Sequence, residues 1–270
     1  DVEKFKGSRY VQNVVGGETY REVKNFLKER KVLYIGTPCQ VAGLKNFLHT
    51  EYNNLITCDL ICHGCSPTAY FLNEVEYRKN KNKLKDITDV RFRGNDDKNY
   101  CFSFWSGDKC LYEERSLGSY YLYGFFKGIT LRENCYVCAY ARPDRISDIT
   151  IGDFIGLGRK EPFKYSKKNV SVVLINTDKG GEFYNELSEN SPELINVKRA
   201  YSERLEYEGS LKKACTMNPL HHTFREIYVE KGYYEASRCV MKRLVGKEKV
   251  KNLMKSPKRI LGKVYRYFFS

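Results

Sequence analysis

Apolar residues recur along the chain with two spacings, and their order predicts an α/β fold. A helical spacing places Val23, Phe26 and Leu27 on one face of residues 19–30. The next apolar runs have the length of buried strands, and each leads into a helical pattern: 31–36 before 41–48, and 54–62 before 67–79. This order is typical of α/β architecture, in which ligands bind at the carboxyl ends of the strands.

The middle of the chain alternates between apolar and polar residues, which predicts an antiparallel meander with strands at 87–94, 99–107 and 109–114. The other expected elements are a helix at 116–128, strands at 148–154 and 170–177, a helix at 179–189 and helices from residue 219. The predicted fold class is therefore α/β: a mixed sheet with flanking helices and an antiparallel meander, plus a C-terminal helical appendage.

Charge divides the chain into a main domain, 1–235, and a basic amphipathic helical tail, 236–270. Residues 238–270 hold 11 Lys or Arg against the single acid Glu248, which is +10 of the formal net charge of +14. A helix is expected over 236–256, with a break at Pro257.

Two interpretations of this tail are open. Its apolar face packs on the domain and leaves the lysines in water, or its basic residues face an anionic partner. An anionic membrane surface is then favoured over nucleic acid, since no base-reading motif accompanies the charge. The basic residues concerned are Lys242, Arg243, Lys247, Lys251, Lys258 and Arg259.

Four of the ten cysteines carry the candidate chemistry. Cys39 and Cys62 follow predicted strands, and Cys135 and Cys138 form a CxxC pair. One close pair with two distant single cysteines suits an iron–sulfur cluster, whereas zinc sites more often use two close pairs. Cys65 forms a second CxxC with Cys62, so a zinc site on both pairs, or Cys65 as a substitute ligand, stays open.

The sequence also indicates the cellular compartment, which decides whether the cysteines are reduced. No apolar segment of signal-peptide or transmembrane length is visible, so reduced thiols and a cytoplasmic location are expected. The remaining cysteines are expected to pack as small buried residues: Cys58, Cys101, Cys110, Cys215 and Cys239.

Turn residues near the cysteines are candidates to surround a cofactor. Gly36, Thr37 and Pro38 precede Cys39, and backbone N–H groups of such turns hydrogen-bond cluster sulfurs. A flavin diphosphate would use glycine amides and a basic side chain, for which the strand end at Gly152 is a candidate. The candidates for that second site are Gly152, Asp153 and Gly156, with Arg91 or Arg93. An ordinary turn with solvated arginines is the alternative.

The motifs together resemble one family, the beta subunit of coenzyme F420 hydrogenase and dehydrogenase, from roughly residue 8 to residue 190. The matching segments are GTPCQVAGLKNFL (36–48), DLICHG (59–64), VRFRG (90–94), LRENCYVCAY (131–140) and SDITIGDFIGLG (147–158). The resemblance implies one 4Fe–4S cluster beside FAD in an α/β domain. It implies four cluster ligands: Cys39, Cys62, Cys135 and Cys138. The residues expected to contact a cofactor are Gly36, Thr37, Pro38, Gln40, His63, Arg93, Gly152 and Asp153. A loop histidine bonded to backbone is the alternative for His63.

Two departures from the family pattern stand out. The family usually reads HGV where this chain has HGC, which makes Cys65 an extra thiol. The usual upstream ferredoxin-like module and Ser-Gly-Gly flavin segment are not in this sequence, so a fragment or a degenerate member is expected.

These observations predict a cytoplasmic oxidoreductase, peripheral at the membrane if the tail binds it. It would pass electrons from a ferredoxin-like donor to a small-molecule acceptor through the 4Fe–4S cluster and FAD. The sequence assigns no catalytic residue and does not name the acceptor. The rival hypotheses are a zinc-binding structural module and a cluster-only electron relay without a substrate site.

Overall fold

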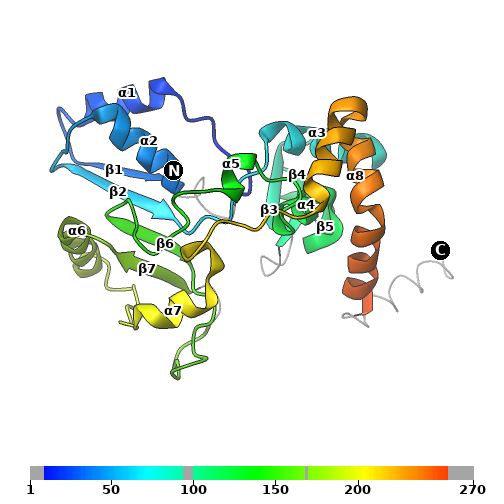
Figure 1. Cartoon of the computed structure of the whole chain (residues 1–270). Helices are drawn as coiled ribbons and strands as arrows, with labels where there is room; N and C mark the ends of the chain where they lie inside the picture. The colour runs from blue at the N-terminus through cyan, green and yellow to red at the C-terminus, as the bar shows by residue number, and fades with distance from the viewer. Residues whose placement is uncertain (1–8, 94–99, 168–169, 255–270) are drawn as a thin grey trace. The chain divides into compact units, whose positions relative to one another are not determined.

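The computed structural model describes residues 9–93, 100–167 and 170–254, and the chain separates into two compact units. The parallel-sheet unit comprises residues 13–63 and 134–215. The meander unit comprises residues 1–12, 64–133 and 216–270. Each unit is built on a sheet of its own (Figure 1).

The sheet of the parallel-sheet unit has the strand order β1-β2-β6-β7. Its strands are β1 (Val32–Gly36), β2 (Leu55–Leu60), β6 (Ile149–Asp153) and β7 (Ser171–Ile175). β1, β2 and β6 run parallel, whereas β7 pairs antiparallel with β6. The predicted mixed sheet is confirmed, and the parallel pairing brings the carboxyl ends of three strands to one edge.

Helices flank this sheet because its two faces carry apolar side chains. On one face α1 (Gly17–Phe26) and α2 (Pro38–Leu48) pack over Tyr34 and Leu55. On the opposite face lies α6 (Asp178–Glu189), where a Cβ at Gly181 would sit 3.4 Å from Cγ2 of Ile175.

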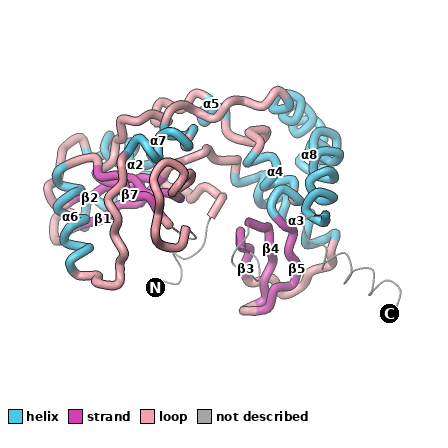
Figure 2. The backbone as a smooth tube through the Cα atoms, turned by 90° about the horizontal axis from the view of Figure 1, so that it is seen from below, coloured by secondary structure: helices cyan, strands magenta, loops and turns pink. Residues whose placement is uncertain are grey.

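The meander unit pairs a three-stranded antiparallel sheet with helices (Figure 2). Its strands are β3 (Asp89–Arg93), β4 (Tyr100–Ser106) and β5 (Lys109–Arg115). Its helices are α3 (Thr68–Lys81), α4 (Tyr120–Phe126) and α8 (Leu220–Met254). Phe92, Phe102, Phe104 and Tyr121 fill the core between them. The predicted meander and the helix after it are confirmed.

The described part of the C-terminal helix α8 packs its apolar face in the meander unit and exposes its basic residues. Met241 and Val245 are buried in the core of the meander unit. The lysines at 242, 247 and 251 and the arginine at 243 are exposed. α8 bends at Gly232, whose φ of 79° is left-handed. The expected domain boundary at 235/236 falls inside this helix. Pro257, Lys258 and Arg259 lie outside the described residues.

Several sequence expectations need correction. Phe26 is 41% exposed rather than packed with Val23, and its ring lies 4.1 Å from the Arg30 guanidinium carbon. β1 was expected to be buried but is an edge strand, with Leu33 and Ile35 about half exposed. α2 begins at residue 38 rather than 41, since proline is tolerated in the first helical turn. Among the described helices, none is both long and apolar enough to cross a membrane.

Candidate functional site

The carboxyl ends of β1, β2 and β6 lie at one edge of the sheet, and several predicted site residues follow these strands. Gly36 pairs with Asp59, and Leu60 pairs with Ile151, so the three strands end close to the same level. Cys39 follows β1 by three residues, and Cys62 follows β2 by two. Adjacent parallel strands therefore lead directly to two of the four predicted ligands, as expected for a ligand-binding edge.

Cys39 lies in the first turn of α2 rather than in a loop, and its side chain is exposed. Its Sγ is 3.2 Å from Oγ1 of Thr37, so a hydroxyl accompanies the thiol. The N–H of Thr37 donates to Oε1 of Gln40 at 2.9 Å, which gives these two residues a helix-capping role.

The Cys39 turn also stands next to two tyrosines that share a hydrogen bond. Burial raises the pKa of Tyr34, and the neighbouring Tyr20 and Cys39 raise it further. The hydroxyl of Tyr20 donates to the carbonyl of Gln40 at 3.0 Å. The tyrosines therefore stay protonated near the thiol and help to fix the start of α2.

Cys62 is half-buried and is followed by His63. Nε2 of His63 lies 3.9 Å from Sγ of Cys215, a cysteine that the sequence pattern assigns only to packing. Burial raises the pKa of the Cys215 thiol, so it is neutral near pH 7. Cys65 belongs to the meander unit, where its carbonyl accepts a hydrogen bond from the N–H of Arg132 at 2.9 Å.

The other cysteines divide by burial. Cys58 and Cys101 are buried as predicted, and burial raises the pKa of Cys58 to about 12. Cys239, by contrast, is exposed on α8, where the prediction of a buried residue is wrong.

Cys135 and Cys138 lie in and just after the short helix α5 (Glu133–Tyr136), and both are half-buried. Val137 between them is 80% exposed. The segment after Cys138 turns back on itself, with the N–H of Ala141 pointing to the carbonyl of Cys138 at 3.4 Å.

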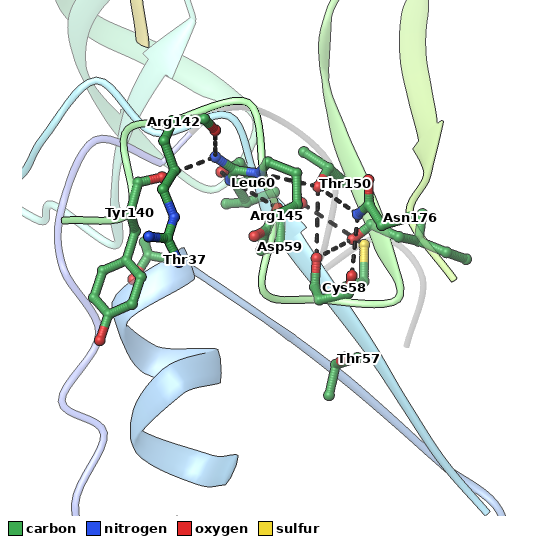
Figure 3. Close-up of polar contacts among 12 residues, drawn as sticks. Thr37, Thr57, Cys58, Asp59, Leu60, Tyr140, Arg142, Arg145, Thr150 and Asn176 are labelled. Atoms are coloured by element: carbon green, nitrogen blue, oxygen red, sulfur yellow. Dashed lines mark hydrogen bonds and ion pairs between the residues drawn. The ribbon is translucent and has the colours of Figure 1, made fainter. Parts of the chain in front are cut away.

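Arg145, in the loop after this pair, ties that loop to the end of β2 (Figure 3). Its Nη2 donates to Oδ1 of Asp59 at 2.9 Å and to the carbonyl of Leu60 at 3.4 Å. The two side chains of the Arg145–Asp59 ion pair are 2% and 0% exposed. A buried arginine with a carboxylate partner fixes geometry strongly, because its planar fork donates in set directions.

The same guanidinium holds the loop itself. Nη1 donates to the carbonyls of Tyr140 at 3.0 Å and Arg142 at 3.4 Å, and Nε donates to Oγ1 of Thr150 at 3.3 Å. The segment that leaves Cys138 is therefore fastened to the strand that leads to Cys62.

A second buried carboxylate joins β2 to β6. Oδ2 of Asp148 accepts hydrogen bonds from the N–H and the hydroxyl of Thr57 at 2.8 and 2.7 Å. Oδ1 accepts from the hydroxyl of Thr177 at 2.9 Å. Burial alone would raise the pKa of Asp148, but these hydrogen bonds and the positive charge of Lys179 outweigh it and lower the pKa.

The glycines predicted to contact a cofactor are closed in by the protein's own side chains. A Cβ at Gly152 would lie 2.9 Å from Cδ1 of Ile61, and one at Gly36 would lie 3.2 Å from Gln40 and Tyr34. Close packing within the unit thus accounts for a glycine at both positions.

The remaining predicted residues are divided between the units. Asp153 is exposed at the end of β6, and Pro38 is buried at the start of α2. Arg93 belongs to the meander unit, where its guanidinium carbon lies 4.1 Å from the ring centroid of Tyr100. Arg93 and Asp153 therefore belong to different units, and their predicted shared pocket stays a prediction.

The four thiols all belong to the parallel-sheet unit. Across residues 9–93, 100–167 and 170–254, no group of three or more His, Cys, Asp and Glu side chains could hold a metal ion. The donor chemistry itself suits an iron–sulfur cluster, since four cysteine thiols are available in this unit.

Sequence reasoning missed Asp59, Arg145 and Asp148. In the sequence, the segment ARPDRIS has the composition of an ordinary polar loop. The role of Arg145 is visible only from its hydrogen bond to Asp59, which lies 86 residues away. One signal was present in the sequence: Asp59 interrupts an apolar strand, and a buried carboxylate requires a cationic or hydrogen-bonding partner.

Comparison with known proteins agrees with the motifs. The family model that describes the C terminus of the "Coenzyme F420 hydrogenase/dehydrogenase, beta subunit" matches residues 29–199, which is more than half of the chain. A search of curated proteins found no match. The matched region includes all four predicted ligands and the strands that lead to them.

Proposed function

This chain belongs to the coenzyme F420 hydrogenase/dehydrogenase beta-subunit family, and from that membership we propose that it is an iron–sulfur oxidoreductase domain. In this proposal Cys39, Cys62, Cys135 and Cys138 bind one 4Fe–4S cluster. When bound, the cluster would supply one-electron transfer between a ferredoxin-like donor module or protein and a small-molecule acceptor.

The observation that carries the proposal is the position of the cysteines in the parallel-sheet unit. Cys39 and Cys62 follow two adjacent parallel strands, and Arg145 fastens the segment after Cys138 to the end of one of them. Two of the cysteine segments therefore follow adjacent strand ends, and the segment after the third and fourth cysteines is tied to one of these ends through Arg145. Packing alone does not explain a concentration of thiols there, because Cys39 is exposed and the others are only half-buried.

The chain's own residues would act on such a cluster in two ways. The amino end of α2 and the hydroxyl of Thr37 stabilise negative charge on the sulfur of Cys39. The protonated Tyr20 and Tyr34 keep this turn fixed through hydrogen bonds. We assign no step to a flavin, since the glycines proposed for it are filled by neighbouring side chains; FAD stays a prediction.

Anaerobic purification of the full-length chain followed by absorption spectroscopy and iron and sulfide analysis tests the proposal. We expect a broad shoulder in the visible absorption spectrum and about four irons per chain, because the proposed cluster contains four irons. Resolved flavin bands would add FAD, whereas a colourless zinc-containing protein would reject the redox function.

Single changes to Ala at the four cysteines identify the ligands, and each is expected to abolish the shoulder. Cys239→Ala is the matched control, since Cys239 is exposed on α8 of the meander unit. Cys215→Ala is unsuitable as a control because Cys215 lies beside His63. If Cys65→Ala removes the cluster and Cys62→Ala leaves it intact, Cys65 rather than Cys62 is the fourth ligand.

A further inference from the structure

Arg145 is buried and makes many more hydrogen bonds than a solvent-exposed arginine does. Its side chain is 2% exposed, and all three guanidinium nitrogens donate hydrogen bonds. A buried charge is retained at a cost in desolvation, which its contacts must offset. The contacts of Arg145 run to two places: the loop that leaves Cys138 and the strand end that leads to Cys62.

These contacts lie close in sequence to two of the predicted cluster ligands. The carbonyls of Tyr140 and Arg142 lie two and four residues after Cys138, and Asp59 and the carbonyl of Leu60 lie three and two residues before Cys62. One side chain therefore spans the interval between two candidate ligand segments.

Asp59 completes the arrangement as the partner of Arg145. Its Oδ1 accepts from Arg145, whereas its Oδ2 is buried and has no hydrogen-bond partner among the residues described. Arg145 is thus the cation that compensates this carboxylate, and the carboxylate sets the direction of the guanidinium.

We propose that Arg145, held by Asp59, is a positioning residue that keeps the Cys138 loop aligned with the Cys62 segment for assembly of a shared iron–sulfur cluster. This inference rests on the proposed function for the cluster, but the fastening of the loop stands on the contacts alone. Arg145 does not touch the cluster in this proposal; it acts through the backbone of the loop.

Three variants separate geometry from charge. Arg145→Met removes both, Arg145→Lys keeps the charge but loses the planar fork, and Asp59→Asn removes the anion but keeps a carbonyl oxygen for Arg145. The matched control is Arg199→Met in the same unit. Arg199 also bridges a loop to a helix, through the carbonyls of Glu161 and Pro162 and the carboxylate of Glu203, with no contact to the cysteine segments.

The first measurement uses full-length protein without cluster. Hydrogen exchange of peptides covering 136–146 is expected to accelerate at least tenfold in Arg145→Met, while Arg199→Met leaves it at the wild-type rate. Equal exchange in wild type and Arg145→Met would overturn the fastening, whatever the wild-type protein binds.

The second measurement uses anaerobically reconstituted protein. Arg145→Met is expected to lose at least half of the cluster iron, and Arg145→Lys to lose less. Asp59→Asn is expected to retain cluster with a raised reduction potential, because a nearby negative charge is removed. Wild-type iron content, potential and electron paramagnetic resonance spectrum in Arg145→Met would overturn the positioning role. A wild-type chain that binds no cluster would reject the proposed function and with it the cluster part of this inference, and the exchange result would still decide the fastening.

Discussion

In the meander unit aromatic rings fill the interior, whereas in the parallel-sheet unit buried charges and hydroxyls join the strand ends to the loops. Phe102 packs against Phe92, Phe104 and Tyr121 with ring centroids 5.5 to 6.0 Å apart. The parallel-sheet unit instead depends on Arg145 and Asp148 at long sequence separation.

The meander unit also contains a buried ion pair, and the contrast between the pairs is informative. Arg78 and Glu74 are four residues apart on α3. Their side chains also join α3 to Tyr112 on β5 and to Tyr233 on α8. Arg145 and Asp59 are 86 residues apart, so their bond defines where a loop lies. The first pair joins elements around a core, and the second holds a loop to the end of a strand. We therefore expect substitutions in the meander unit to affect stability and those at the strand ends to affect cofactor chemistry.

The largest effect is expected for Phe102→Ala in the meander unit. Phe102 is fully buried, and removing such a ring leaves a cavity that costs about 3–5 kcal/mol. The single tryptophan, Trp105 on β4, reports on this unit in urea unfolding followed by fluorescence. A loss below about 1 kcal/mol would contradict the aromatic core as the main source of stability there.

A smaller loss of stability is expected in the parallel-sheet unit, where Gly180 lies close to the backbone of Asp148. A Cβ at Gly180 would lie 2.3 Å from the carbonyl oxygen of Asp148, so Gly180→Ala should destabilise by about 1–3 kcal/mol. Gly181→Ala is the matched control on the same helix, because its Cβ would meet Ile175 at 3.4 Å. It should be neutral or stabilise by up to about 1 kcal/mol. Circular dichroism during thermal unfolding measures both, and equal Tm values would contradict the close approach.

The smallest effect is the pH dependence that Asp148 gives to the parallel-sheet unit. Its pKa is lowered in the folded state, so its contribution to stability is complete above the pKa of the unfolded chain and is lost as pH falls through the folded pKa. We expect a loss of the order of 1 kcal/mol as the pH falls below about 4. Hydrogen exchange of β2 and β6 peptides measures it. Asp148→Asn should be less stable at pH 7 and show a flatter acid dependence; an unchanged dependence would assign the effect to other groups.

The sequence predicted the elements well wherever apolar spacing is local. β2 and the meander strands follow from runs and alternation within a few residues, and the positions of Cys39 and Cys62 after strands follow from the same pattern. Phe26 is not buried with the other apolar residues of its helix face; its ring is partly exposed, and the guanidinium of Arg30 lies over it. The pattern cannot show this, since it carries no information on which apolar residue lies at the margin of a core.

The site was predicted less completely because its positioning contacts are long-range. No spacing rule links Asp59 to Arg145 or Thr57 to Asp148, each separated by more than 80 residues. Likewise, Gly36 and Gly152 resemble cofactor-binding glycines in sequence, and only the structure shows Gln40 and Ile61 occupying the adjacent space.

The division of the chain has a consequence for its synthesis and its evolution. Of the described residues, the meander unit takes 9–12, 64–93, 100–133 and 216–254, and the parallel-sheet unit takes the two segments between the first and last of these. A growing polypeptide therefore cannot complete the parallel-sheet unit before β7 emerges from the ribosome, and the meander core must wait for α8. No single cut in the gene would release either unit whole. The region that the family model matches, residues 29–199, takes residues from both units.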